Sequence, residues 1–168
     1  MPPKTVFSLE AVFAKKGDSL ILYYGPFDAM KMILIDGGPR GVFNAFLKPR
    51  LDQLRDTFEL EDEDPLPFEM VMVSHIDDDH IAGILDLFDQ NAEAMRLKKP
   101  QPYSAGVLWH NSFEDLLGGA GAAQVAEAAV AANTGAIGSL PKMTDESMAV
   151  IASTPQGKAL RELARKLK

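Results

Sequence analysis

The chain has 168 residues, of which 46% are hydrophobic and 24% charged; this composition is typical of a globular domain with its own core and excludes a disordered or fibrous protein. Its net charge of -7 argues against broad electrostatic binding to nucleic acid or anionic membranes, because such binding depends on clustered lysine and arginine. A nucleic acid stays open as a substrate, since bound divalent metals would reverse the local field. Without cysteine, neither a disulfide framework nor a thiolate metal site can form.

The sequence carries no signal for secretion or membrane insertion. The segment 1–7 is not followed by the apolar core and small-residue cleavage site of a secretory signal, and no stretch approaches the roughly 20 apolar residues of a membrane span. We therefore expect no membrane association, a cytoplasmic location and a single domain over residues 1–168. A further domain upstream of this chain would change the expected location.

The first elements along the chain are predicted to be a hairpin and a third strand. Residues 7–14 and 19–24 are rich in strand-forming side chains, and the polar, glycine-containing segment 15–18 between them is typical of a hairpin loop. The apolar run 32–35 predicts a third strand, which delivers Asp36 followed by Gly-Gly-Pro. An Asp-Gly pair after a strand is ordinarily only a turn.

An amphipathic helix is predicted over residues 42–58, because apolar side chains recur there at steps of three and four. Pro49 lies inside this segment, so the helix either kinks there or begins again with Pro49 in its first turn. We expect the apolar stripe to pack against the sheet. The acidic segment 59–67 follows as a solvated loop, since it lacks the glycine and the alternating oxygen spacing of a calcium loop.

The next apolar run ends abruptly in charged residues. Residues 71–74 predict the end of a buried strand, residues 81–97 have helical spacing, and two histidines enclose three carboxylates between them. Open α/β sheets bind ligands where strands end, because the side chains there are exposed but rigidly based. Imidazole and carboxylate together suit zinc, manganese or iron. The predicted metal ligands are His75, Asp77, Asp79 and His80.

An alternative without a metal is that Asp79 caps the following helix and its acidic neighbours favour the positive end of that helix. Helix capping accounts for Asp79 only. Three carboxylates packed between two histidines repel one another unless a cation lies among them, so we favour the metal site.

A strand over residues 105–109 is predicted next, parallel to the strand before the charged loop, because strand, helix and strand form a βαβ unit. His110 and Asn111 leave this strand at the same edge of the sheet and are predicted as pocket residues. A lone histidine after a strand is more often a structural residue than a metal ligand.

The remaining chain predicts two further features. Residues 118–138 are rich in alanine and glycine and could overhang the site as a lid. The segment 154–158 opens a final helix with Pro155 suited to its first turn. This helix is expected to pack on the sheet rather than on a membrane, through an apolar face of Leu160, Leu163, Ala164 and Leu167.

The charged loop resembles the metal-binding signature of the metallo-β-lactamase-fold hydrolases, His-x-His-x-Asp-His, which stands here as His75-x-Asp77-x-Asp79-His80. Asp77 replaces the second histidine, a departure similar to the branch that includes the hydrolase domain of bacterial DNA-uptake competence proteins. Residues 32–39 resemble the first motif of the same family, a strand that ends in Asp-Gly. The two motifs in this order are more specific than either alone.

The resemblance implies particular roles for these residues. His75 and Asp77 would be ligands of a first divalent metal, and Asp79 and His80 ligands of a second. Asp36 would orient the metal-binding loop from behind, as carboxylates commonly do beside histidine ligands. Zinc and manganese are the expected metals, with iron as a third option, and the oxygen ligand from Asp77 makes the first site more suitable for manganese.

The resemblance also implies a fold, an α/β architecture in which a mixed sheet with flanking helices forms half of an αββα sandwich. This chain matches only the N-terminal half. The C-terminal half of the family supplies another histidine, a bridging aspartate and a last histidine, whereas no histidine follows His110 here. We therefore expect an incomplete domain, in which a missing C-terminal half, a partner chain or a second copy completes the site.

The implied activity is hydrolysis by a metal-bound hydroxide, with Asp79 also positioning the nucleophile and Asp36 bracing the loop. The variant motif favours a phosphodiester substrate over a small molecule such as a β-lactam or thioester. One alternative is a catalytically inactive metallo-β-lactamase-like binding or interaction domain that lacks the second-half ligands. Another is a domain with one structural metal and no enzymatic activity. A chelator would then unfold the domain.

Overall fold

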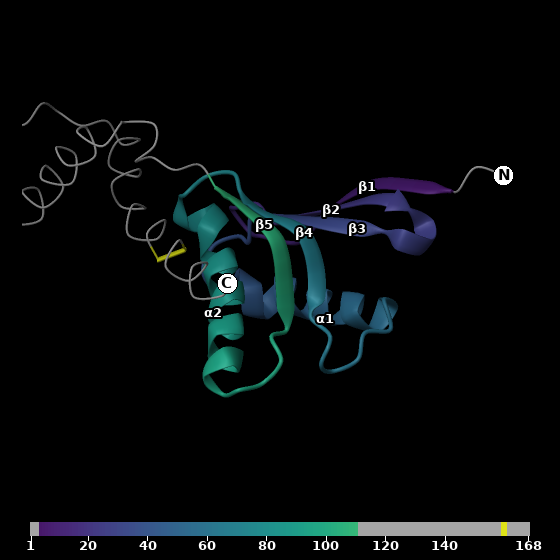
Figure 1. The fold of residues 1–168 in the computed structure, drawn as a ribbon. Helices are drawn as coiled ribbons and strands as arrows, with labels where there is room; N and C mark the ends of the chain where they lie inside the picture. Colours follow the sequence, from purple (N-terminus) through teal and green to yellow (C-terminus); the bar gives the residue numbers. More distant parts are fainter. Residues whose placement is uncertain (1–3, 111–158, 161–168) are drawn as a thin grey trace, which may run out of the picture.

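The computed structural model describes residues 4–110 and 159–160, and the structural statements below concern these residues (Figure 1). They form a five-stranded mixed sheet in the order β1-β2-β3-β4-β5, in which the first three strands are antiparallel and the last three parallel. The predicted α/β class with a mixed sheet is therefore confirmed. The strands are β1 (Thr5–Ala11), β2 (Leu20–Pro26), β3 (Lys31–Ile35), β4 (Leu66–Val73) and β5 (Tyr103–His110).

The N-terminal hairpin is present as predicted. β1 pairs with β2 in antiparallel register, with Ala11 opposite Leu20 beside the polar loop. β2 continues to Pro26, and a short 3-10 turn, η1 (Phe27–Ala29), connects it to β3. β3 then ends at Ile35, which leaves Asp36 at the edge of the sheet.

Pro49 lies in the first turn of a helix. A π-helical turn, η2 (Phe43–Leu47), leads without a break into α1 (Lys48–Thr57), and Pro49 lies in the first turn of α1. The position of Pro49 in a first turn agrees with the second predicted option, although the backbone stays helical at Leu47 and Lys48 and does not restart. The predicted apolar stripe packs into the core through Val42, Phe43, Leu47, Leu51 and Leu54, all of which are buried.

The helix after the charged loop, α2 (Asp78–Arg96), begins three residues earlier than the spacing predicts. Apolar periodicity detects only the turns that face the core, and the first turn of α2 is polar. Asp77 occupies the N-cap position, with an extended backbone and no capping hydrogen bond from its side chain. The alternative in which Asp79 caps the helix is wrong, because Asp79 lies inside the first turn.

β5 pairs in parallel with β4 along its length, which confirms the predicted βαβ unit. α1 and α2 both contact β4 (Figure 1), and the side chains of one sheet face, among them Leu34 and Val71, are buried beneath the helices. Leu160 is buried in the same core, as predicted for the final helix.

Several predicted features lie outside the described residues. They are Asn111, the alanine- and glycine-rich segment 118–138, and the final helix apart from residues 159–160. Among the helices that are described, none is both long and apolar enough to cross a membrane.

Candidate metal centre

The carboxyl ends of three parallel strands and one loop meet at one end of the sheet. β3, β4 and β5 run parallel, so Ile35 lies beside Met72 and Val73 lies beside His110. β2 runs antiparallel to β3 and starts with Leu20 opposite Ile35, so the hairpin loop before Leu20 reaches this end as well. The polar residues that these segments bring to this end are Asp18, Asp36, His75, Asp77, Asp79, His80 and His110.

Asp36 links the ends of β3 and β4 to the first turn of α2. Its backbone has a left-handed conformation, with φ of 58°, and its N–H donates to the carbonyl of Met72 at 2.9 Å. The buried carboxylate accepts a hydrogen bond from the backbone N–H of Ser74 at 2.8 Å and another from the Ser74 hydroxyl. Oδ2 also lies 2.9 Å from Nδ1 of His80. The His80 ring is therefore held from the end of the neighbouring strand.

Glycines allow the backbone that follows β3 to pack directly against the backbone of α2, next to Asp36 and His80. Gly37 donates its N–H to the carbonyl of His80 at 2.8 Å, and Gly83 donates to the carbonyl of Gly38 at 3.0 Å. A Cβ atom on Gly83 would lie 1.9 Å from the carbonyl oxygen of Gly37, so no side chain fits between them. Gly17 is similar, since its Cβ would lie 1.9 Å from the carbonyl oxygen of Asp79. The hairpin loop and α2 therefore pack backbone against backbone.

The four predicted metal ligands lie at this end of the sheet as two pairs. His75 Nδ1 is 2.9 Å from Asp77 Oδ2, and His80 Nε2 is 3.9 Å from Asp79 Oδ1. The two imidazole rings are 5.8 Å apart between centroids. Among the described residues these four do not form a group of three or more ligand atoms within 4.8 Å of one another, so their joint role as ligands stays a prediction.

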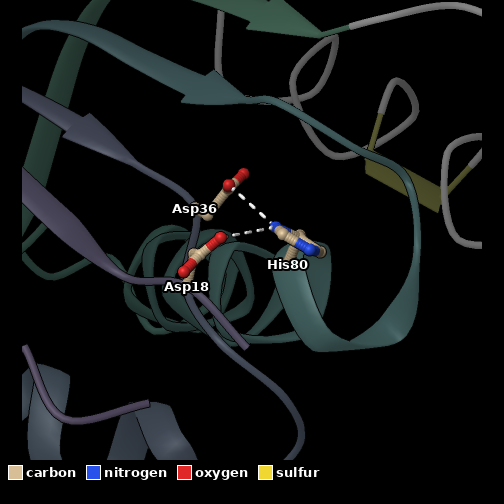
Figure 2. A group of neighbouring side chains, drawn as sticks. All are labelled: Asp18, Asp36 and His80. Atoms are coloured by element: carbon tan, nitrogen blue, oxygen red, sulfur yellow. Dashed lines mark hydrogen bonds and ion pairs between the residues drawn. The ribbon is translucent and has the colours of Figure 1, made fainter. Parts of the chain in front are cut away.

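Asp18 is a further member of this cluster that the sequence reasoning missed. Its Oδ2 lies 3.8 Å from His80 Nδ1, and Figure 2 shows Asp18 and Asp36 both directed at the His80 ring. These three residues can each offer a ligand atom within 4.8 Å of the others. The predicted hairpin contained the signal, because the residue just before β2 must lie beside the residue just after an antiparallel β3.

The two ring nitrogens of His80 offer two different ways to hold a cation. Through Nδ1 the partners would be Asp18 and Asp36, whereas through Nε2 the partner would be Asp79. Nδ1 is already hydrogen bonded to Asp36, whose oxygens also accept from Ser74. A cation at Nδ1 would have to displace this buried network, so the geometry favours Nε2.

The protonation of His80 is biased by its surroundings. Burial alone would lower the pKa of His80, because it disfavours the charged imidazolium. The hydrogen bond with Asp36 and the charges of Asp36, Asp79 and Asp18 together outweigh burial and raise the pKa of His80 above its ordinary value. The imidazolium form of His80 is therefore more stable here than in a free histidine side chain.

We expect the metal-free chain to lose stability as the pH rises. The pKa of His80 is raised in the folded state above the ordinary 6.5, so its stabilising contribution is fully present below pH 6.5 and is lost as the pH rises through the folded-state value. An NMR titration in the presence of a chelator should give His80 a pKa above 6.5. In urea unfolding, the His80→Gln variant should lack this part of the pH dependence. A measured pKa at or below 6.5 would contradict the expectation.

α2 carries acidic side chains at Asp78, Asp86 and Asp89, and their charges affect one another. Burial raises the pKa of Asp86, and the charges of Asp89 and Asp78 raise it further, while Arg40 opposes them. Arg40 is exposed, and its Nε lies 3.3 Å from Asp78 Oδ1. Arg40 and Asp78 thus form an ion pair at the first turn of α2.

His110 ends β5 beside Val73. Its Nδ1 is buried and has no hydrogen-bond partner among the described residues. Its role as a pocket residue stays a prediction, and the described geometry does not place it in the cluster around His80.

A hollow of about 420 Å³ lies elsewhere, between α2 and β5, and is lined by residues that include Phe88, Asn91, Tyr103 and Leu108. None of the predicted site residues lines it. Asn91 is occupied there as a structural residue, because its side chain makes two hydrogen bonds with the backbone of Tyr103. The candidate metal centre thus lies at the carboxyl ends of the parallel strands and not in this hollow.

No family model, curated protein or solved structure matches this chain. The case for its function therefore rests on its residues and their geometry.

Proposed function

We propose that this chain is a metal-dependent hydrolase and forms the N-terminal sheet-and-helix half of a metallo-β-lactamase-like αββα sandwich. His80 and Asp79, in the first turn of α2, would hold the metal together with His75 and Asp77 from the preceding loop. The observation that carries this proposal is the contact of 2.9 Å between the buried Asp36 and Nδ1 of His80.

This contact prepares His80 to act as a ligand. A carboxylate that accepts a hydrogen bond from Nδ1 keeps the proton on that nitrogen, so the lone pair of Nε2 is free, as in most metal-binding histidines. Asp79 Oδ1 is 3.9 Å from Nε2. Bonds of about 2.0–2.2 Å from nitrogen and oxygen to a shared metal allow such a separation. The donor set of imidazole and carboxylate therefore fits a divalent cation.

A divalent cation held here would lower the pKa of a bound water to near neutral and stabilise negative charge on the substrate. The residues of the chain have supporting roles in this proposal. Asp36 fixes the His80 ring, Ser74 restrains Asp36, and Asp79 orients the attacking oxygen. Two metals would need more donors than His75, Asp77, Asp79 and His80 supply. The expected second ion therefore depends on residues beyond the described ranges or on another chain.

The substrate class that we propose is a phosphodiester. One support is the resemblance of the Asp77-containing motif to the hydrolase domain of competence proteins. Another is Arg40, an exposed cation beside Asp78 at the same turn, since guanidinium groups bind phosphate oxygens well. Hydrolysis of a neutral small-molecule ester would gain nothing from this cation.

The test is manganese and zinc binding by calorimetry, together with hydrolysis of bis(4-nitrophenyl) phosphate, on the full chain. We expect Asp79→Asn to weaken metal binding by at least about 100-fold, since even residues behind the ligands are worth about 10–100-fold. Metal-dependent hydrolysis should be lost in the same variant. Asp62→Asn removes the same charge from an exposed loop and should leave both properties unchanged.

Each outcome separates the alternatives. Metal binding that depends on Asp79 but supports no hydrolysis would indicate a structural metal, and a chelator should then unfold the chain. The absence of metal binding at millimolar concentrations would overturn the proposal and favour a catalytically inactive binding domain.

A further inference from the structure

The sheet face opposite the helices is apolar across all five strands. The strand register aligns its side chains in rows, because residues paired between neighbouring strands point to the same face. One row is Leu9, Leu22, Ile33, Met70 and Val107. A second row is Ala11, Leu20, Ile35, Met72 and Trp109. We call this surface the open face.

In the described part of the chain, the open face is exposed on its outer strands β1 and β5 and half-buried at its centre, for example at Ile33 and Met70. Its outermost side chains have large exposed fractions, 83% for Phe7, 58% for Leu9, 50% for Val107 and 45% for Trp109. Residues of alternate parity, such as Ile21 and Leu34, are fully buried under the helices. Monomeric globular proteins rarely expose a continuous apolar surface of this kind, so a partner is expected to cover it.

The charges on the open face do not oppose self-association. At the end of the face remote from the metal centre, Lys31 Nζ lies 2.9 Å from Glu69 Oε1, so these two charges neutralise each other within one copy. The two apolar rows contain no charged residue. Two identical faces can therefore meet without bringing like charges together, as an isologous interface requires.

The area is sufficient for a specific dimer. Five strands spaced about 4.8 Å apart, each about 20 Å long, give a flat area of about 500 Å² per copy. Two copies would bury at least about 1,000 Å² in total, which reaches the range of specific interfaces. Two such sheets would pack about 10 Å apart with their side chains interdigitated.

The described C-terminal residues do not cover this face. Leu160 is fully buried in the core cluster with Leu34 and Val71, which lies on the helix side of the sheet. We therefore propose that the open face is a homodimer interface, in which two copies of this chain pack sheet against sheet with their helices on the outside. This inference needs neither the metal centre nor hydrolase activity, but the second copy would take the place of the C-terminal half in the proposed αββα sandwich.

The chain contains a single tryptophan, Trp109, and it lies on the open face, so it reports directly on the interface. At about 10 µM, well above the dissociation constant expected for an interface of submicromolar affinity, light scattering should give twice the chain mass of 18.3 kDa. Dilution should shift the Trp109 emission to longer wavelength as the dimer dissociates.

Two variants make the test specific to this face. Ile33→Lys places a charge at the centre of the open face and should give a monomer with red-shifted Trp109 emission. Val107→Glu does the same at the rim, where the folded monomer tolerates a polar side chain more easily, and circular dichroism checks that both variants fold. Ser8→Lys, on β1 but of the opposite parity, is the matched control and should remain a dimer. A monomeric wild type, a dimer that survives Val107→Glu, or an open series of larger aggregates would overturn the proposal.

Discussion

Replacement of Gly83 by alanine is expected to destabilise the chain by about 3 kcal/mol or more, although alanine is the better helix former by about 1 kcal/mol. The added Cβ would lie 1.9 Å from the carbonyl oxygen of Gly37 and 2.6 Å from its carbonyl carbon. Both atoms belong to the backbone, so no side-chain rotation can relieve the contact. α2 would have to move away from the end of β3, which breaks the hydrogen bonds from Gly83 to Gly38 and from Gly37 to His80. Urea unfolding followed by circular dichroism measures this loss.

The matched control is Gly41→Ala. Gly41 has a left-handed backbone with φ of 81°, but a Cβ placed there would meet nothing within 4 Å. Its substitution should therefore cost only the backbone strain, about 1–2 kcal/mol. If Gly83→Ala were as stable as the wild type, the close crossing of the two backbones could not be a feature of the folded chain.

The second large effect is expected for Asp36→Asn, which should weaken metal binding by about 10–100-fold while the chain stays folded. Asparagine has the shape of aspartate and tolerates the left-handed backbone at this position. Its amide nitrogen, however, donates and cannot accept, so the side chain loses one of the two acceptor oxygens that Asp36 offers to Ser74 and His80. If the amide faces the ring, it donates to Nδ1 and moves the ring proton to Nε2, the nitrogen that the metal requires.

Calorimetry with manganese or zinc gives the affinity, and nitrogen chemical shifts of His80 give its tautomer. The pKa of His80 should also fall, because the carboxylate that raises it is gone. Asp56→Asn, at an exposed position on α1, removes an equal charge away from the site and should change neither property. An unchanged affinity in a folded Asp36→Asn variant would show that Asp36 does not set the orientation of His80.

Local sequence patterns were sufficient for the N-terminal hairpin and for the parallel pair β4–β5, but not for the pairing of β3 with β2 and β4 or for the start of β4 at Leu66. The alternating runs before and after residues 15–18 predict a hairpin, and the strand, helix and strand over residues 71–109 predict a parallel pair, because both connections are short and have few alternatives. Closeness in sequence places His75 beside Asp77 and Asp79 beside His80, as two pairs. For Pro49, the sequence left two options open, a kink and a first turn, and the structure has it in the first turn of α1.

The long-range part of the site could not be predicted in the same way. Asp18 approaches His80 across 62 positions of sequence, and only the register of β2 against β3 brings it there. The need for glycine at positions 37 and 83 depends on the distance between two backbones, which no single segment encodes. The start of α2 was placed too late because its first turn is polar and faces the site, where the rule that apolar residues mark a helix does not apply.

His75 and His80 differ in how firmly the fold holds them. His80 is fixed by its carbonyl to Gly37 and by its ring to Asp36, and its side chain is 21% exposed. His75 belongs to the loop, is 54% exposed and is turned towards Asp77. An arriving ion would therefore meet one donor already in position and one that has to rotate. Loading of the site should accordingly proceed in two kinetic phases, a fast capture by His80 and a slower closure by the loop.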